Sequence, residues 1–175
     1  MEDFMTELFT NRSLGGGIDQ IPLPSDCPGE LWLCGKHVIG LDVEATLSFT
    51  GADRVVCLTQ RHELIDRYPA YVSWLDDNQP SRATWAATPD LGTLSADESL
   101  QLYRTLTNFV QAGAKLIVHC AAGIGRSGTA AVAILMLLGT EIGEAEDIVA
   151  ANRPMAGPET GPQRKLLENL ALSLR

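Results

Sequence analysis

Short apolar runs rich in β-forming residues alternate along this chain with segments of helical spacing. The runs cover residues 31–34, 55–59, 85–88 and 116–120. The central ones are apolar without interruption, which is typical of strands buried on both faces of a sheet. We therefore predict four strands at these positions.

The helical segments are predicted at residues 95–113, 127–138, 143–152 and 163–174. In the first, Ser95 and Glu98 form a Ser-x-x-Glu capping box, apolar residues recur on one face, and Gly113 suits the C-terminal cap. Residues 127–138 carry no charge, which is typical of a helix buried at the centre of a domain. Strands alternating with helices predict an α/β fold with a mostly parallel central sheet flanked by helices, where ligands gather at the carboxyl ends of the strands.

A length of 175 residues fits one domain. Residues 1–29 contain the Gly15-Gly16-Gly17 run and three prolines, and we interpret them as an N-terminal arm packed on a domain formed by residues 30–175.

The net charge of −9 argues against binding to nucleic acid or to anionic membranes, because both need a basic surface. The charges are unevenly distributed. Six acidic residues and one arginine lie within residues 1–30, whereas no acidic residue occurs between Glu98 and Glu141. That window contains Arg104, Lys115 and Arg126, so the sequence allows a locally positive pocket for an anion.

The four cysteines form no CxxC pair and the histidines are not clustered, so we expect neither a metal site nor a cofactor. The N-terminus does not resemble a signal peptide, and the longest apolar run, residues 130–138, is too short to span a bilayer. We expect a cytoplasmic protein with reduced thiols, in which Cys34 and Cys57 are buried core residues. A protective disulfide between one of them and Cys120 is left open.

The most informative stretch is residues 118–129, Val-His-Cys-Ala-Ala-Gly-Ile-Gly-Arg-Ser-Gly-Thr. Cys120 leaves a predicted strand and precedes a predicted helix, where unpaired amides and the helix dipole favour a thiolate, the nucleophilic form. Glycines allow successive N–H groups to face one concavity that holds an anion. The planar guanidinium of Arg126 can grip two phosphate oxygens. The expected phosphate cradle consists of Ala121, Ala122, Gly123, Ile124, Gly125 and Arg126.

Attack by a thiolate on a phosphate ester also needs a group that protonates the leaving oxygen and later activates water. Asp90 is the best candidate, because it lies in the Pro/Gly-containing loop Thr88-Pro89-Asp90-Leu91-Gly92 after a predicted strand. Asp97 is the second candidate, although its place in the first turn of a helix is also explained by the helix dipole.

These residues resemble the cysteine-dependent protein phosphatases of the small, atypical dual-specificity type. The family signature is His-Cys, five residues, then Arg followed by Ser or Thr, and residues 119–127 match every fixed position. Residues 58–61 and 158–163 are also similar, so that the resemblance covers about residues 30–172. The chain departs from the pattern at Thr88, where a tryptophan is usual, and at Gly161-Pro162.

The resemblance implies a monomeric enzyme that removes phosphate from phosphotyrosine, with or without phosphoserine and phosphothreonine, in proteins. Cys120 would be the nucleophile, Arg126 would bind phosphate and Asp90 would be the general acid and then base. Ser127 would donate a hydrogen bond to the leaving thiolate, His119 would brace the loop, and Gln163 would help to place the water.

Two other functions remain open. A phosphate-recognition module without turnover is disfavoured, because the nucleophile, the arginine, the serine and an acid are all present. A phosphoinositide phosphatase usually carries lysines in this loop to hold a polyanion, whereas this chain has Ala121, Ala122 and Ile124 at the variable positions. An arsenate reductase or low-molecular-weight phosphatase has the cysteine near the N-terminus and the acid after it, which is the reverse of the order here.

Overall fold

A five-stranded sheet forms the centre of the molecule in a computed structural model, which describes residues 2–175, with side chains from residue 4 onward. Its strands are β1 (Ile18–Ile21), β2 (Glu30–Gly35), β3 (Arg54–Cys57), β4 (Ala83–Trp85) and β5 (Lys115–Cys120). They lie in the order β1-β2-β5-β3-β4, and only β1 runs antiparallel to its neighbour. The predicted α/β class with a mostly parallel sheet is therefore confirmed.

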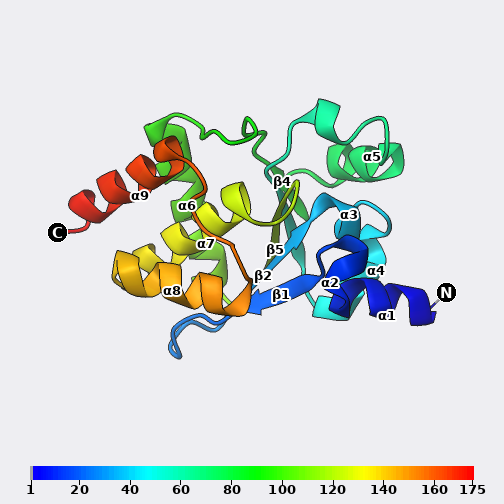
Figure 1. Ribbon diagram of the computed structural model, residues 1–175, viewed down its shortest axis with the longest axis horizontal. Helices are drawn as coiled ribbons and strands as arrows, with labels where there is room; N and C mark the ends of the chain where they lie inside the picture. The colour runs from blue at the N-terminus through cyan, green and yellow to red at the C-terminus, as the bar shows by residue number, and fades with distance from the viewer. Residues whose placement is uncertain (1) are drawn as a thin grey trace.

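Helices cover both faces of the sheet (Figure 1). One face packs against α6 (Ala96–Gln111), α7 (Gly125–Leu137), α8 (Ile142–Asn152) and α9 (Gly161–Ser173). The other packs against α1 (Glu2–Thr10), α3 (Lys36–Ile39), α4 (Val43–Thr50) and α5 (Pro69–Asn78). The short helices α2 (Arg12–Gly15) and η1 (Arg61–Glu63) lie in connections.

The central strand β5 shows why two hydrophobic cores form. Its side chains alternate between the faces, as the pleat of a strand requires. Leu116, Val118 and Cys120 belong to the core under α6–α9, whereas Ile117 belongs to the core under α1 and α3–α5. Both neighbours of β5 are parallel strands, which explains the uninterrupted apolar character of this segment.

The predicted helices are present with small shifts at their ends. The capping box of Ser95 and Glu98 starts α6 as expected, but Ala112 takes the C-cap position and Gly113 follows it with φ +92°. The helix predicted from residue 127 begins at Gly125. The strand predicted at 85–88 is displaced, because β4 pairs with β3 through residues 83–85.

The N-terminal arm contains structure that the sequence pattern did not predict. It forms α1 and α2 and then adds β1 to the sheet as an edge strand beside β2. The helices α3, α4 and α5 were likewise not predicted, because each is too short to show a clear helical repeat of apolar residues. The arm therefore contributes both a strand and a helical cover to the main fold.

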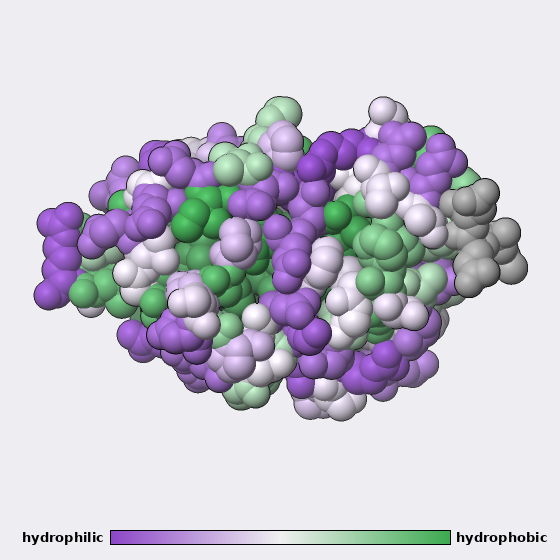
Figure 2. All heavy atoms as spheres, turned by 90° about the horizontal axis from the view of Figure 1, so that it is seen from below, coloured by the Kyte–Doolittle hydropathy of each residue, from purple (hydrophilic) through white to green (hydrophobic). Residues whose placement is uncertain are grey.

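Seen from below, hydrophobic side chains reach the surface in two areas separated by a hydrophilic band (Figure 2). Among the described residues, no helix combines the length and the apolar character needed to cross a membrane.

Candidate active site

The loop between β5 and α7 gathers the residues singled out by the sequence. β5 ends at Cys120 and α7 starts at Gly125, so residues 121–124 connect the carboxyl end of a central strand to a helix N-terminus. Gly123 has φ +75°, and a Cβ at this position would lie 2.4 Å from the carbonyl oxygen of Cys34. Only glycine fits there. Among the residues that the structure describes, no side chain caps the N-terminus of α7, which leaves its amides free for an anion.

The carbonyl groups of this loop accept hydrogen bonds from neighbouring segments. Ala121 O accepts a hydrogen bond from Lys36 N at 3.0 Å. Ile124 O accepts from Gly128 N at 2.9 Å and from Gly157 N at 3.2 Å. In a planar trans peptide the C=O and N–H point in opposite directions, so each held carbonyl turns the next amide toward the inside of the loop. The geometry is that of an anion-binding nest.

Arg153 holds the remaining two carbonyls of the loop. Its Nε donates to Gly123 O at 2.6 Å and its Nη2 to Ala122 O at 2.9 Å. Its Nη1 donates to Asp19 Oδ2 at 2.6 Å and also to the carbonyls of Gly16 and Gly17. Only 3% of Arg153 is exposed. One buried guanidinium therefore joins the phosphate-loop candidate to the N-terminal arm.

Cys120 lies in front of this nest, beside a hydroxyl group. Its Sγ is 3.3 Å from Ser127 Oγ, and the two residues are 3% and 0% exposed. Ser127 lies in the first turns of α7, so its hydroxyl is fixed by the helix. Either atom of this pair could be the donor, and the hydroxyl lies where it can donate to a thiolate at this sulfur.

His119 lies on the opposite face of β5 and braces the loop through the backbone. Its Nδ1 lies 3.3 Å from Cys120 O, and its Nε2 lies 2.6 Å from the Tyr71 hydroxyl. Burial lowers the pKa of His119 to about 4 and raises the pKa of Tyr71 well above 10. Tyr71 is therefore the donor to Nε2, and the neutral imidazole donates from Nδ1 to Cys120 O.

Arg126 is oriented by a carboxylate that the sequence reasoning missed. Its Nη1 and Nη2 each donate at 2.8 Å to the two oxygens of Glu63, in a bidentate ion pair. Burial opposes the ionisation of Glu63, but the hydrogen bonds from Arg126 and from Gln60 N–H outweigh it and lower the pKa of Glu63. Nη1 also donates to Thr88 O at 2.9 Å. Within the described residues, the Nε of Arg126 donates no hydrogen bond.

Asp90 reaches the same guanidinium from the acid-bearing loop. Its Oδ1 lies 3.1 Å from Arg126 Nη2, and 66% of its side chain is exposed. The structure thus places Asp90 at the exposed mouth of the site, beside Arg126. Asp97 is exposed in the first turn of α6 and lines a different depression with Leu100 and Leu170. Of the two acids predicted from the sequence, Asp90 is the one beside Arg126.

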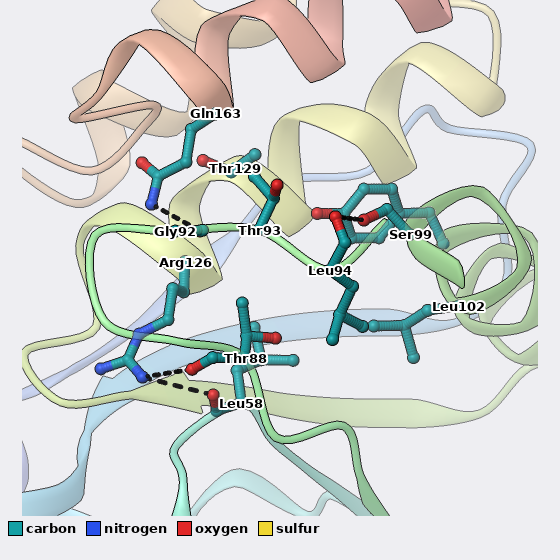
Figure 3. A pocket seen from close by; sticks show the side chains of 11 residues that line it. Leu58, Thr88, Gly92, Thr93, Leu94, Ser99, Leu102, Arg126, Thr129 and Gln163 are labelled. Carbon is teal, nitrogen blue, oxygen red and sulfur yellow. Dashed lines mark hydrogen bonds between the residues drawn. The ribbon is translucent and has the colours of Figure 1, made fainter. Parts of the chain in front are cut away.

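Gln163 lies behind the acid-bearing loop (Figure 3). Its Nε2 donates to Gly92 O at 3.3 Å, and its Oε1 accepts from Glu159 N at 2.8 Å. Thr160 Oγ1 also donates to Leu91 O at 3.0 Å. The start of α9 therefore fastens the loop that carries Asp90, and both ends of the Gln163 amide are engaged in this contact.

A small cavity lies between this loop and α7, lined by Leu58, Thr88, Gly92, Arg126, Thr129 and Gln163 among others (Figure 3). Its volume of about 10 Å³ is enough for a single water molecule. Cys120 does not line this cavity, which is too small for a side chain.

Glu159 adds a second carboxylate near the mouth. A Cβ on Gly125 would lie 1.9 Å from Glu159 Oε2, so that glycine is needed for the carboxylate to lie over the start of α7. Glu159 is exposed. The sequence had marked residues 158–163 only as similar to a family pattern.

The other thiols lie apart from Cys120. Cys34 and Cys57 belong to the core on the opposite face of the sheet, and all four cysteines are free. Burial raises the pKa of Cys34 and of Cys57 to about 12, so both stay protonated. A disulfide from either to Cys120 is therefore not supported by the fold, because the side chains point away from each other.

Three contacting residues were not found from the sequence: Glu63, Tyr71 and Arg153. Gln60 and Glu63 form a capping box at η1. This pattern indicates a turn, but it does not indicate that Glu63 pairs with Arg126. Arg153 follows the helix predicted at residues 143–152 and precedes Pro154, a position that indicates only the end of that helix. Their partners are distant in sequence, so that no local pattern indicates these pairs.

Comparisons with known proteins agree with this fold. A family model for the DSP-PTPase phosphatase domain of Swiss Army Knife proteins (PTP-SAK) matches residues 28–165. The solved structure of Tk-PTP in its active form has a TM-score of 0.66 at 25% sequence identity, covering 87% of this chain and 96% of that chain. None of the curated protein sequences matches the chain.

Two further solved structures show the same fold at lower identity. Kinase-associated phosphatase (KAP), with its catalytic-site cysteine substituted by serine, has a TM-score of 0.73 at 21% identity, covering 90% of this chain and 94% of that chain. Human DUSP28 has a TM-score of 0.64 at 18% identity, covering 89% and 94%.

Proposed function

The chain belongs to the DSP-PTPase family of cysteine-dependent phosphatases, and from this premise we propose that it hydrolyses phosphomonoesters on proteins through a phosphocysteine on Cys120. The preferred group is phosphotyrosine, with phosphoserine and phosphothreonine as further substrates. The observation that carries the proposal is that Asp90, from a separate segment, reaches the segment that contains Cys120, Arg126 and Ser127. Cys120 contacts Ser127, and Asp90 contacts Arg126 of the same loop.

In the first step the Cys120 thiolate attacks phosphorus and the bond from phosphorus to the ester oxygen breaks. The inward amides of residues 121–126 and the Nε edge of Arg126 hold the three non-bridging oxygens as charge develops on them. Asp90, in its acid form, gives its proton to the departing ester oxygen, so that an alcohol leaves. The ion pair with Glu63 fixes the plane of the Arg126 guanidinium during this step.

In the second step a water molecule attacks the phosphocysteine. Asp90, now a carboxylate, takes a proton from that water, and inorganic phosphate leaves as the S–P bond breaks. Ser127 Oγ, 3.3 Å from the sulfur, donates a hydrogen bond to the departing thiolate. For Gln163 we propose a positioning role, because its amide holds the backbone at Gly92 and Glu159; placement of the water by the same amide stays a prediction.

Two features support a monophosphate on a protein over a polyanionic lipid headgroup. The variable positions of the loop, Ala121, Ala122 and Ile124, carry no charge. Asp90 and Glu159 place two carboxylates near the mouth. Additional phosphates would meet repulsion there. The chemistry needs no metal, because the amides and Arg126 supply the positive charge.

The test is turnover of a small aryl phosphate without added metal, with Cys120→Ser as the inactive variant. We expect vanadate to block the wild-type protein. Asp90→Asn should slow turnover by about 10²-fold or more on substrates with poor leaving groups, and less on good ones. Asp97→Asn is the matched control and should behave as wild type.

Two results would overturn the proposal. Wild-type protein without Cys120-dependent turnover would leave a phosphate-recognition module. Equal slowing by Asp90→Asn and Asp97→Asn would remove Asp90 from the role of acid. Comparing a phosphotyrosine peptide, a phosphothreonine peptide, a phosphoinositide and an RNA 5′-phosphate then ranks the substrates, and the phosphotyrosine peptide should have the highest kcat/KM.

A further inference from the structure

A groove runs beside the phosphate loop, between that loop and the N-terminal arm. We call it the arm groove. It is lined mainly by apolar atoms, has a volume of about 380 Å³ and is formed by Gly15 and Gly16 of the arm, Ala122 and Ile124 of the phosphate loop, His37 and Met155. This volume falls within the ~300–1,000 Å³ of small-ligand sites. A Cβ on Gly16, the C-cap of α2, would lie 4.0 Å from Ala122 O, so the end of α2 is close to the loop that follows β5.

The arm groove is continuous with the proposed active site. Ala122 and Ile124 line the groove, and their backbone amides belong to the phosphate nest. The groove and the nest are therefore separated only by the backbone of the phosphate loop. An extended peptide advances about 3.3–3.6 Å per residue. A residue one or two positions from a phosphoresidue held at Cys120 can therefore reach the groove.

The charges around the groove are already engaged. Arg12 donates from both Nη atoms to Asp19, and Arg153 donates to Asp19 and to buried carbonyls. The imidazole of His37 lies 2.6 Å from the Tyr68 hydroxyl, and burial lowers its pKa. An acidic residue or a second phosphate would find few free donors there, whereas an apolar side chain needs none.

Met155 is the most exposed large apolar side chain of the described residues, at 79%. Its φ of +69° is unusual for a residue other than glycine, and such conformations cluster at sites of function. Met155 is one of the residues that line the groove. A ligand that covered Met155 would remove this apolar surface from water.

We propose that the arm groove binds an apolar side chain of the substrate protein, one or two residues from the phosphoresidue. The inference rests on the proposed function and adds the substrate sequence that the site selects. It makes the N-terminal arm one wall of the specificity pocket.

The test uses Cys120→Ser protein, so that binding is measured without turnover. Fluorescence anisotropy gives Kd for phosphotyrosine peptides that carry Leu, Ser or Asp at each position flanking the phosphotyrosine, plus a peptide with a second phosphotyrosine. We expect Leu to be favoured over Ser by about tenfold at one flanking position, from burial of one aliphatic side chain.

The variant Met155→Asn, which tolerates positive φ, should reduce that ratio to about threefold or less. It should leave hydrolysis of the small aryl phosphate unchanged in protein that retains Cys120. Leu172→Asn is the matched control: Leu172 is an exposed leucine on α9, at 63%, and the ratio should stay at the wild-type value.

A Leu to Ser ratio below twofold at every position would overturn the proposal, as would a preference for Asp or for a second phosphotyrosine, or an unchanged ratio in Met155→Asn. These outcomes differ from failure of the proposed function, which is absence of Cys120-dependent aryl phosphate turnover in the wild-type protein.

Discussion

Replacing Arg153 by methionine tests whether a buried guanidinium outside the reacting atoms sets the shape of the phosphate loop. Met keeps most of the length of the side chain but donates no hydrogen bond. The change removes the donors at 2.6 Å from Gly123 O and at 2.9 Å from Ala122 O. Asp19 keeps Arg12 as a partner, so no carboxylate is left without a cation.

The size of the effect follows from these contacts. Each carbonyl left without a donor costs about 1–3 kcal/mol, so we expect the free energy of unfolding to fall by about 3 kcal/mol in urea titrations. The two freed peptide units carry amides of the nest. We therefore expect the inhibition constant for vanadate to rise and kcat/KM for a small aryl phosphate to fall, each by about tenfold or more.

The matched control is Lys165→Met, which removes an exposed ion pair with Glu168 on the surface of α9. It should cost no more than about 0.5 kcal/mol and leave vanadate inhibition unchanged. The reasoning is refuted if Arg153→Met loses stability while vanadate inhibition and kcat/KM stay within twofold of wild type. In that case Arg153 stabilises the fold without shaping the nest.

Two further predictions concern the other contacts that sequence reasoning missed. Glu63→Gln should lower kcat/KM at least tenfold in steady-state assays, because the Arg126 guanidinium loses the charged fork that orients it; Glu44→Gln, at an exposed ion pair with Arg82, should have no effect, and equal effects would contradict the argument. His119 has a folded-state pKa of about 4, below its unfolded value near 6.5, so its contribution to stability is present above pH 6.5 and is lost as the pH falls toward 4. Urea unfolding at pH 8 and pH 5 should differ by about 2 kcal/mol from this group, and His119→Asn should show a correspondingly smaller difference; an unchanged pH dependence in the variant would refute the assignment.

Much of the central fold could be predicted from the sequence because its signals are local. The uninterrupted apolar run of β5 and the uncharged α7 follow from burial, and the Ser95 capping box starts α6 where the pattern places it. The structure of the N-terminal arm could not be predicted from local signals. β1 has only four residues and its pairing with β2 depends on tertiary contacts.

The residues of the site also divide into those with a local sequence signal and those without one. Cys120, Arg126 and Ser127 stand within one loop, so their spacing was informative, and Asp90 was found from loop chemistry. Glu63 and Arg153 act on that loop from 63 and 30 residues away. A single sequence contains no local signal for such pairs, because each depends on where the sheet brings distant connections together.

The alternation of side chains along β5 has a consequence for oxidation. Cys120 faces α7, whereas Cys34 and Cys57 face the opposite core and are protonated. Cys27 precedes β2 and thus lies toward the other end of the strands. A sulfenic acid formed on Cys120 therefore has no internal thiol positioned to capture it as a disulfide. Capture as a disulfide then needs a thiol from solution, before further peroxide converts the sulfenic acid to the sulfinic acid.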